Sequence, residues 1–197
     1  MKKIIPPPDI QAVANGIRKQ ILGVALKTGG CYLAQACSSA EIIASLYTRV
    51  MNLGPSVGSW EPIPFPGVPG PDNMDYQRGS SYNGAPATGI RTRFFVSCCH
   101  YASVIYAALA ETGRISPDCM DKFNVDGWNM EMIGAEHSPG FENTAGSLGQ
   151  TISIAGGTAH ARKRAATPAS AMFCSVTVNC RRSDLGVHSG SRLLQAG

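Results

Sequence analysis

The alternation of helix-spaced apolar residues with short apolar runs most restricts what this chain can fold into. Five apolar residues recur at helical spacing near the start of the chain, namely Ile10, Val13, Ile17, Ile21 and Val24. Gly29-Gly30 can end this first helix in a left-handed turn. Arg93–Ser97 is a short apolar run suited to a buried strand, and a helix is predicted over His100–Thr112 directly after it. Helices that alternate with short apolar runs predict α/β layering.

Capping patterns predict three further helices. Ser38 and Glu41 form a capping-box pattern, which places the start of a second helix at Ser38 or Ser39. Ser116-Pro117 predicts a short helix through Phe123, because proline is favoured at the first helical position. Ser147 and Gln150 repeat the capping-box pattern before a helix of small residues, which can lie close against a sheet or another helix. The longest uncharged run, Phe94 to Ala110, is interpreted as buried core.

Residues 54–90 break the periodicity. Their proline and glycine content is too high for a helix or an inner strand. A loop this long inside a compact domain is usually functional or wraps a neighbour. A mobile surface excursion is an equally good interpretation of the sequence.

Composition excludes several classes of protein. With 197 residues, of which 44% are hydrophobic and 15% charged, the chain fits one globular domain rather than a disordered tail or a coiled coil. The net charge of +4 arises in residues 162–197, where six basic residues face one acidic residue. These charges are scattered, with little aromatic interleaving, so binding to nucleic acid is not expected. No membrane span is expected either.

The N-terminal segment and the cysteines indicate a compartment. Residues 1–8 contain no apolar signal region, so a cytoplasmic location is expected. Seven cysteines, an odd number without regular spacing, fit reduced thiols better than a disulfide framework. No set of cysteines and histidines has the spacing of a zinc site, and no metal-ligating residues are predicted.

The first candidate site is Ser97-Cys98-Cys99-His100, at a predicted strand-to-helix junction. Ligands of open α/β sheets bind at the carboxyl ends of strands, where helix N-termini offer N–H groups to anions. His100 could donate a hydrogen bond to a phosphate or a substrate oxygen there, although a core histidine with satisfied hydrogen bonds explains it as well. Cys98 or Cys99 beside His100 could be a thiol nucleophile, but adjacency in sequence does not fix that geometry.

The second candidate site is the glycine-containing turn before the small-residue helix. Gly146-Ser147-Leu148-Gly149 allows close backbone approach by a flat ligand or a phosphate, but it is neither a P-loop nor a dinucleotide fingerprint. His137 lies in a turn-rich loop that could face the same cleft. His160 is expected on the surface of the last helix.

Several segments together carry a resemblance to a known family. They are Ser39–Tyr47, Arg93–Ser97 with His100, Tyr106–Leu109, Pro139–Glu142 and Thr144–Gln150. In this order they resemble the N-terminal, diphosphate-binding domain of transketolases, over roughly residues 12–164. The Gly-Ser-Leu-Gly-Gln element, with Pro-Gly-Phe-Glu before it, is the most specific part.

The resemblance implies a fold, a cofactor and a reaction. The fold is a doubly wound, mostly parallel sheet with helices on both faces, incomplete at the C-terminus. The cofactors are thiamine diphosphate and Mg²⁺, and the reaction passes a two-carbon ketol unit from a ketose to an aldose. His100 matches the family histidine near the diphosphate and the substrate. Gly146, Ser147, Leu148 and Gly149 match the loop that lines the cofactor, and His137 is assigned to cofactor binding with them.

The resemblance also implies a partner. A pyrimidine-binding domain is absent from this sequence, which is similar in that respect to split transketolases. The expected partners are therefore a separate C-terminal transketolase subunit that carries that domain and a sugar or sugar-phosphate substrate. The alternatives are a subunit of another thiamine-diphosphate enzyme, of the 2-oxo-acid dehydrogenase type, and a non-catalytic interaction protein that keeps the dimer surface.

Two departures from the family bear on activity. Tyr32 stands roughly where the family has a histidine after its first helix, and tyrosine cannot shuttle protons near neutral pH as histidine does. The Asp-Gly motif and the later asparagine that hold Mg²⁺ in the family do not follow residue 164. The chain as written is therefore expected to bind the cofactor weakly or not at all.

Residues 165–197 form an irregular basic tail that does not resemble the family. A shifted reading frame, taking the third base of each codon with the first two of the next, lets residues 175–181 encode Asp-Gly-Glu-Leu-Gln. The same shift lets residues 165–169 encode Gly-Asp-Thr-Gly, and both match the family pattern at this place. We therefore expect the diphosphate-binding domain to span residues 1–164 and the reading frame to change near Ala165.

Overall fold

A computed structural model describes residues 9–68, 70–74, 76–84, 92–144, 146–164 and 171–175. The α-helices are α1 (Ile10–Thr28), α2 (Leu33–Ser45), α3 (Ala102–Glu111) and α4 (Gln150–Arg164), and the strands are β1 (Arg93–Ser97) and β2 (Ala171–Ser175). Short helical turns lie between them, namely η1 (Leu46–Val50), η2 (Gly79–Asn83), η3 (Cys99–Tyr101) and η4 (Pro117–Lys122).

Helix α1 ends where the sequence predicts, and an aspartate side chain caps its start. The Asp9 side chain accepts a hydrogen bond from the Gln11 N–H, and Gly29 ends the helix at φ 76° with its N–H donating to the Ala25 carbonyl. The strand over residues 93–97, the short helix capped by Ser116 and the small-residue helix from Gln150 are confirmed as well.

The predicted start of the second helix is wrong. Helix α2 begins at Leu33, five residues before Ser38. The hydroxyls of Ser38 and Ser39 donate to the Gln35 carbonyl within the helix rather than capping its first turn. Serine makes either bond, so a capping-box pattern alone does not distinguish a helix start from a helix interior.

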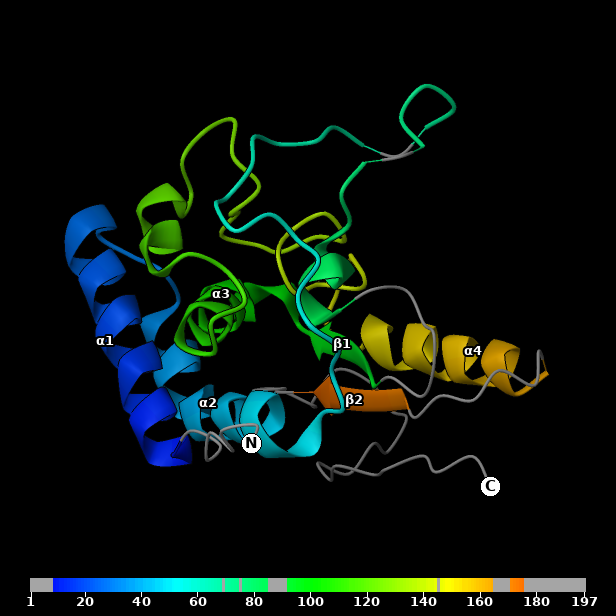
Figure 1. Cartoon of the computed structure of the whole chain (residues 1–197), viewed down its shortest axis with the longest axis horizontal. Coiled ribbons are helices and arrows are strands. Elements are labelled where there is room, and N and C mark those ends of the chain that lie inside the picture. Colours follow the sequence, from blue (N-terminus) through cyan, green and yellow to red (C-terminus); the bar gives the residue numbers. More distant parts are fainter. Residues whose placement is uncertain are drawn as a thin grey trace, which may run out of the picture.

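The core lies between the three helices α1, α2 and α3. Helix α3 is buried along its whole length except at Glu111, and α1 and α2 pack against it (Figure 1). The uncharged run from Phe94 to Ala110 is buried as predicted, with half-buried His100 as its exception. The half-buried ring of His100 shows that this part of the run lies at the edge of the core, next to solvent.

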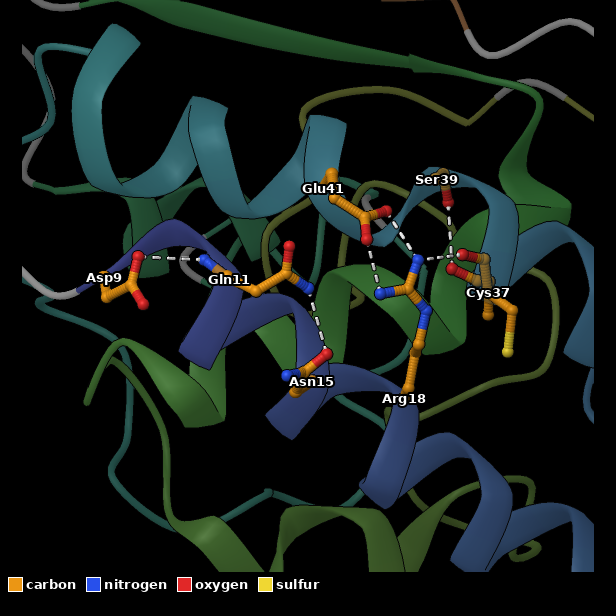
Figure 2. A network of polar contacts seen from close by, with 8 residues as sticks. Asp9, Gln11, Asn15, Arg18, Cys37, Ser39 and Glu41 are labelled. Carbon is orange, nitrogen blue, oxygen red and sulfur yellow. Dashed lines mark hydrogen bonds and ion pairs between the residues drawn. The ribbon is translucent and has the colours of Figure 1, made fainter.

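An ion pair joins α1 to α2. The Arg18 guanidinium donates to both carboxylate oxygens of Glu41 at 2.5 Å and to the Cys37 carbonyl at 2.9 Å (Figure 2). The bidentate geometry restricts both side chains more than a single contact does. This contact fixes the position of α2 along α1.

Strands β1 and β2 pair in parallel, with Arg93 opposite Ala171 and Ser97 opposite Ser175. In Figure 1 the two strands lie between α4 on one side and the α1–α3 group on the other. This arrangement is compatible with part of an α/β domain, while a doubly wound sheet of more strands stays a prediction. β2 falls within the tail expected to be irregular, and residues 165–170 and 176–197 lie outside the described residues.

The described part of the proline- and glycine-rich segment is held at several points. Arg114 Nη1 donates to the carbonyls of Gly54 at 3.0 Å and Tyr82 at 2.8 Å, which ties both ends of the loop to the segment after α3. The Phe65 N–H donates to the Gly127 carbonyl at 2.8 Å. The described loop therefore packs on the domain rather than extending freely from it.

No helix in the described segments has the length and apolarity needed to cross a membrane.

Candidate functional site

His100 lies directly after β1, at the carboxyl end of the strand. Its Nδ1 is 3.1 Å from the Cys98 sulfur, and its ring meets the Tyr32 ring edge-on, with centroids 5.2 Å apart and planes at 86°. Two neighbours from different elements therefore limit how the imidazole can turn. A half-buried histidine at this position can donate a hydrogen bond or a proton to a ligand outside the core.

Tyr32 reaches His100 because the backbone before α2 is tightly fixed. Tyr32 adopts a left-handed conformation with φ 55°, which is uncommon for a bulky residue. The carbonyl of the preceding Cys31 accepts a hydrogen bond from the Ser103 hydroxyl at 3.1 Å. Backbone strain maintained by such contacts is often found at functional sites.

The glycine turn before α4 lies on the surface. Gly146, Ser147, Leu148 and Gly149 are all exposed, and Gly149 has φ 83°. The next turn of α4 is anchored, because the Thr151 hydroxyl donates to the Val96 carbonyl at 3.3 Å and accepts from Asn143 at 3.2 Å. The N-terminus of α4 is thereby fixed beside the carboxyl end of β1.

His137 lies in a cluster that the sequence does not reveal. Its Nε2 contacts the carboxylate of Glu131, and the Ser138 hydroxyl donates to the other oxygen of that carboxylate at 2.5 Å. The Phe65 ring, from the proline-rich loop, meets the His137 ring edge-on at 4.8 Å. Tyr106 donates to the Glu131 carbonyl at 3.0 Å, and burial raises the pKa of Tyr106 well above its usual value.

Two hydrogen bonds from backbone N–H groups link the loop of His137 to the segments on either side of it. The Gly134 N–H donates to the Cys99 carbonyl at 3.1 Å, which joins the loop of His137 to the turn that carries His100. The Glu136 N–H donates to the Thr144 hydroxyl at 3.0 Å, which joins the same loop to the chain before the glycine turn. His100, His137 and residues 146–149 therefore belong to adjoining segments at one end of β1.

A buried carboxylate fixes the opposite end of β1. The Glu142 side chain is fully buried, pairs with Arg93 and accepts a hydrogen bond from the Phe94 N–H at 3.0 Å. The acidic residue of the Pro-Gly-Phe-Glu segment thus holds the strand in place rather than facing a ligand.

The described residues contain no group of three or more histidine, cysteine, aspartate or glutamate side chains that could hold a metal ion. The groups that the structure places at this end of β1 include an imidazole, a thiol, a carboxylate-bound histidine and an exposed helix N-terminus. Such a set can bind an anion and move a proton.

Two curated proteins match this chain. An uncharacterised transketolase family protein, y4mO, from Sinorhizobium fredii is 31% identical over 152 residues. A 6-deoxy-6-sulfo-D-fructose transketolase subunit, SqwG, from a Clostridium species is 30% identical over the same length. Each match covers 77% of this chain. The chain is a transketolase relative.

This relationship confirms the resemblance on which the sequence analysis rests. The matched stretch spans less than half of each relative, 44% and 45% of their lengths. No family model matches the chain. Transketolases in general use thiamine diphosphate, and the roles of His100, His137 and residues 146–149 toward such a cofactor stay predictions.

Sequence reasoning missed the role of Glu131. It stands six residues before His137 in a turn-rich segment, so no helical or strand spacing links the two. The turn itself folds the chain back and joins them. His160 is exposed on α4, as predicted.

Proposed function

We propose that this chain is the N-terminal, diphosphate-binding subunit of a transketolase-like enzyme that transfers a two-carbon ketol unit from a ketose to an aldose. The observation that carries the proposal is the pair of transketolase relatives, at about 30% identity over 152 residues. The geometry supports it, since His100 and the first turn of α4 both lie at the carboxyl end of a parallel strand, where α/β proteins bind ligands.

The N-terminus of α4 fits the diphosphate of the proposed cofactor. Helix α4 has 15 residues, and the turn before it is exposed, with Gly149 in a backbone conformation that favours glycine. Free N–H groups and the helix dipole favour an anion there. Thiamine diphosphate supplies an electron sink for cleavage of the bond next to the ketose carbonyl.

The chain's own residues would position the ligands and supply a proton. We assign to His100 a hydrogen bond, or a proton, to an oxygen of the substrate or the diphosphate. Tyr32 limits the rotation of the His100 ring. Glu131 would hold His137 in one orientation, because it binds that ring through Nε2. The Asp-Gly motif expected to hold Mg²⁺ does not follow residue 164, so we keep the prediction that the chain as written binds the cofactor weakly.

The partner that we propose is a separate C-terminal subunit with a pyrimidine-binding domain. One matched relative is itself named as a transketolase subunit. Leu148 and Ile152, beside the proposed cofactor site, are 54% and 37% exposed. Apolar side chains this exposed next to a ligand site suit burial under a second subunit.

The experiment combines this chain, and a version with the shifted frame from residue 165 onward, with the C-terminal subunit, thiamine diphosphate and Mg²⁺. Donors would include ketose phosphates, 6-deoxy-6-sulfo-D-fructose and 2-oxo acids. We expect ketol transfer by the frame-shifted version and little or none by the chain as written. His100→Ala should lower kcat by at least about a hundredfold, the scale of general acid–base catalysis, and His160→Ala should not.

Each other outcome supports an alternative. Decarboxylation of a 2-oxo acid without ketol transfer would indicate an enzyme of the 2-oxo-acid dehydrogenase type. Co-purification with the C-terminal subunit without cofactor-dependent turnover by either version would indicate an interaction protein and would overturn the proposal.

A further inference from the structure

The pair formed by Cys98 and His100 has a chemistry of its own. The Cys98 sulfur lies 3.1 Å from Nδ1 of His100, within hydrogen-bonding distance for a thiol and an imidazole. Both residues follow β1. The ring of Tyr32 contacts the ring of His100 edge-on. An imidazole at this distance can take the thiol proton and leave a thiolate, which is the nucleophilic form of cysteine.

Four other cysteines whose side chains the structure describes differ from Cys98 in burial or in recorded contacts. Cys31, Cys99 and Cys119 are at most 1% exposed, whereas Cys98 is 8% exposed. Burial raises the pKa of Cys119 to about 12 and also raises that of Cys31, so both stay protonated. Cys37 is more exposed than Cys98, and no imidazole contact with it is found among the described residues. Cys98 thus combines a base with some access to solvent.

We propose that Cys98 is a peroxide-sensitive thiol, activated by His100 and oxidised to a sulfenic acid. The thiol proton passes to Nδ1 of His100. The sulfur attacks one oxygen of hydrogen peroxide, so that an S–O bond forms and the O–O bond breaks. The leaving hydroxide takes the proton from His100 and becomes water. The sulfur loses two electrons and the peroxide gains them, so one thiol and one peroxide give one sulfenic acid and one water.

Oxidation of Cys98 would change the orientation of the His100 ring, and so the way in which the ring faces a ligand. A sulfenic acid adds an oxygen next to Nδ1, and that oxygen competes for the hydrogen bond that orients the ring. A thiol reductant reverses the step. The inference does not depend on the proposed transketolase function, since it concerns the thiol and not turnover.

The test measures oxidation at each cysteine separately. The full chain is treated with hydrogen peroxide, trapped with dimedone, digested and analysed by mass spectrometry, with no cofactor or partner present. We expect the dimedone adduct to form at Cys98 at least about threefold faster than at Cys37, because the imidazole of His100 contacts the Cys98 sulfur and can take its proton. His100→Gln should remove this difference, and His160→Gln should leave it unchanged.

A second measurement covers the case in which His100→Gln does not fold. In the wild-type chain unfolded by urea, the rates at Cys98 and Cys37 should become about equal, since unfolding separates the pair. Oxidation at Cys98 no faster than at Cys37 in the folded chain would overturn the proposal. A rate advantage that persists in urea, or in a folded His100→Gln variant, would overturn it too.

Discussion

At the scale of single residues, the Arg18–Glu41 pair makes a testable contribution to stability. The hydrogen bond from Arg18 lowers the pKa of Glu41 below its usual value of 4.5, and this effect is larger than that of the Arg18 charge. A carboxylate with a lowered pKa in the folded state stabilises the fold above its unfolded pKa, and this stabilisation is lost as the pH falls through the folded pKa. The contribution should therefore be present at pH 7 and disappear in acid.

Glu41→Gln should lower the free energy of unfolding at pH 7 by about 0.5–1 kcal/mol, a value kept small because both side chains are partly exposed. The difference from wild type should shrink as the pH falls below the usual carboxyl pKa and through the lowered pKa of the folded state. Urea denaturation at several pH values measures it. Asp121→Asn is the matched control, since its pair with Lys27 is well exposed and should contribute almost nothing. A pH-independent difference would contradict this account.

The position of a site residue along the chain was easier to predict than its contacts with other elements. The position of His100 after a strand followed from the apolar run before it, and that position is confirmed. The contact of Tyr32 with His100 joins residues 68 positions apart and needs a left-handed backbone at a tyrosine. Sequence periodicity carries no information on such a contact, because it depends on packing between elements.

At the scale of elements, Gly79 shows how η2 is fitted to the loop after His137. A side-chain carbon at Gly79 would lie 1.8 Å from the Ser138 carbonyl oxygen, a backbone atom that cannot turn away. The Gly79 N–H also donates to the Glu136 carbonyl, and its own carbonyl accepts from Gly140. Glycine is thus required by a close backbone approach.

Gly79→Ala should destabilise the fold by about 1–3 kcal/mol, the range of overpacking. Gly23→Ala, in the middle of α1, is the matched control. Nothing lies within 4 Å of the added carbon there, so alanine should stabilise the helix by about 0.5–1 kcal/mol. Urea denaturation of the two variants beside wild type measures both effects. Equal effects at the two positions would contradict the close approach.

The element boundaries show where sequence patterns sufficed. α1 ended at Gly29 as predicted, because a left-handed glycine is a strong helix terminator. α2 began at Leu33 and not at the predicted serines. Its N-cap residue Tyr32 makes no side-chain capping hydrogen bond, so no capping pattern marks this start in the sequence. A helix that is started by packing rather than by a cap leaves no local signal.

At the scale of the whole molecule, the second strand bears on the reading frame. β2 pairs with β1 through backbone atoms, and a parallel ladder forms with many side-chain sequences. A strand at Ala171–Ser175 is therefore compatible with the amino acids as written and with those of the shifted frame. The frame has to be tested on the nucleic acid and on cofactor binding.

We expect the coding DNA, resequenced from codon 155 to beyond the last codon, to contain a one- or two-base slip near codon 165. Correcting it should restore Asp-Gly-Glu-Leu-Gln after β2 and supply a carboxylate ligand for Mg²⁺, which prefers oxygen donors. The corrected chain with its partner should then bind thiamine diphosphate more tightly when Mg²⁺ is added, measured by calorimetry. The chain as written should show no such dependence on Mg²⁺. An unbroken frame would contradict the prediction and would favour an interaction protein that needs no cofactor.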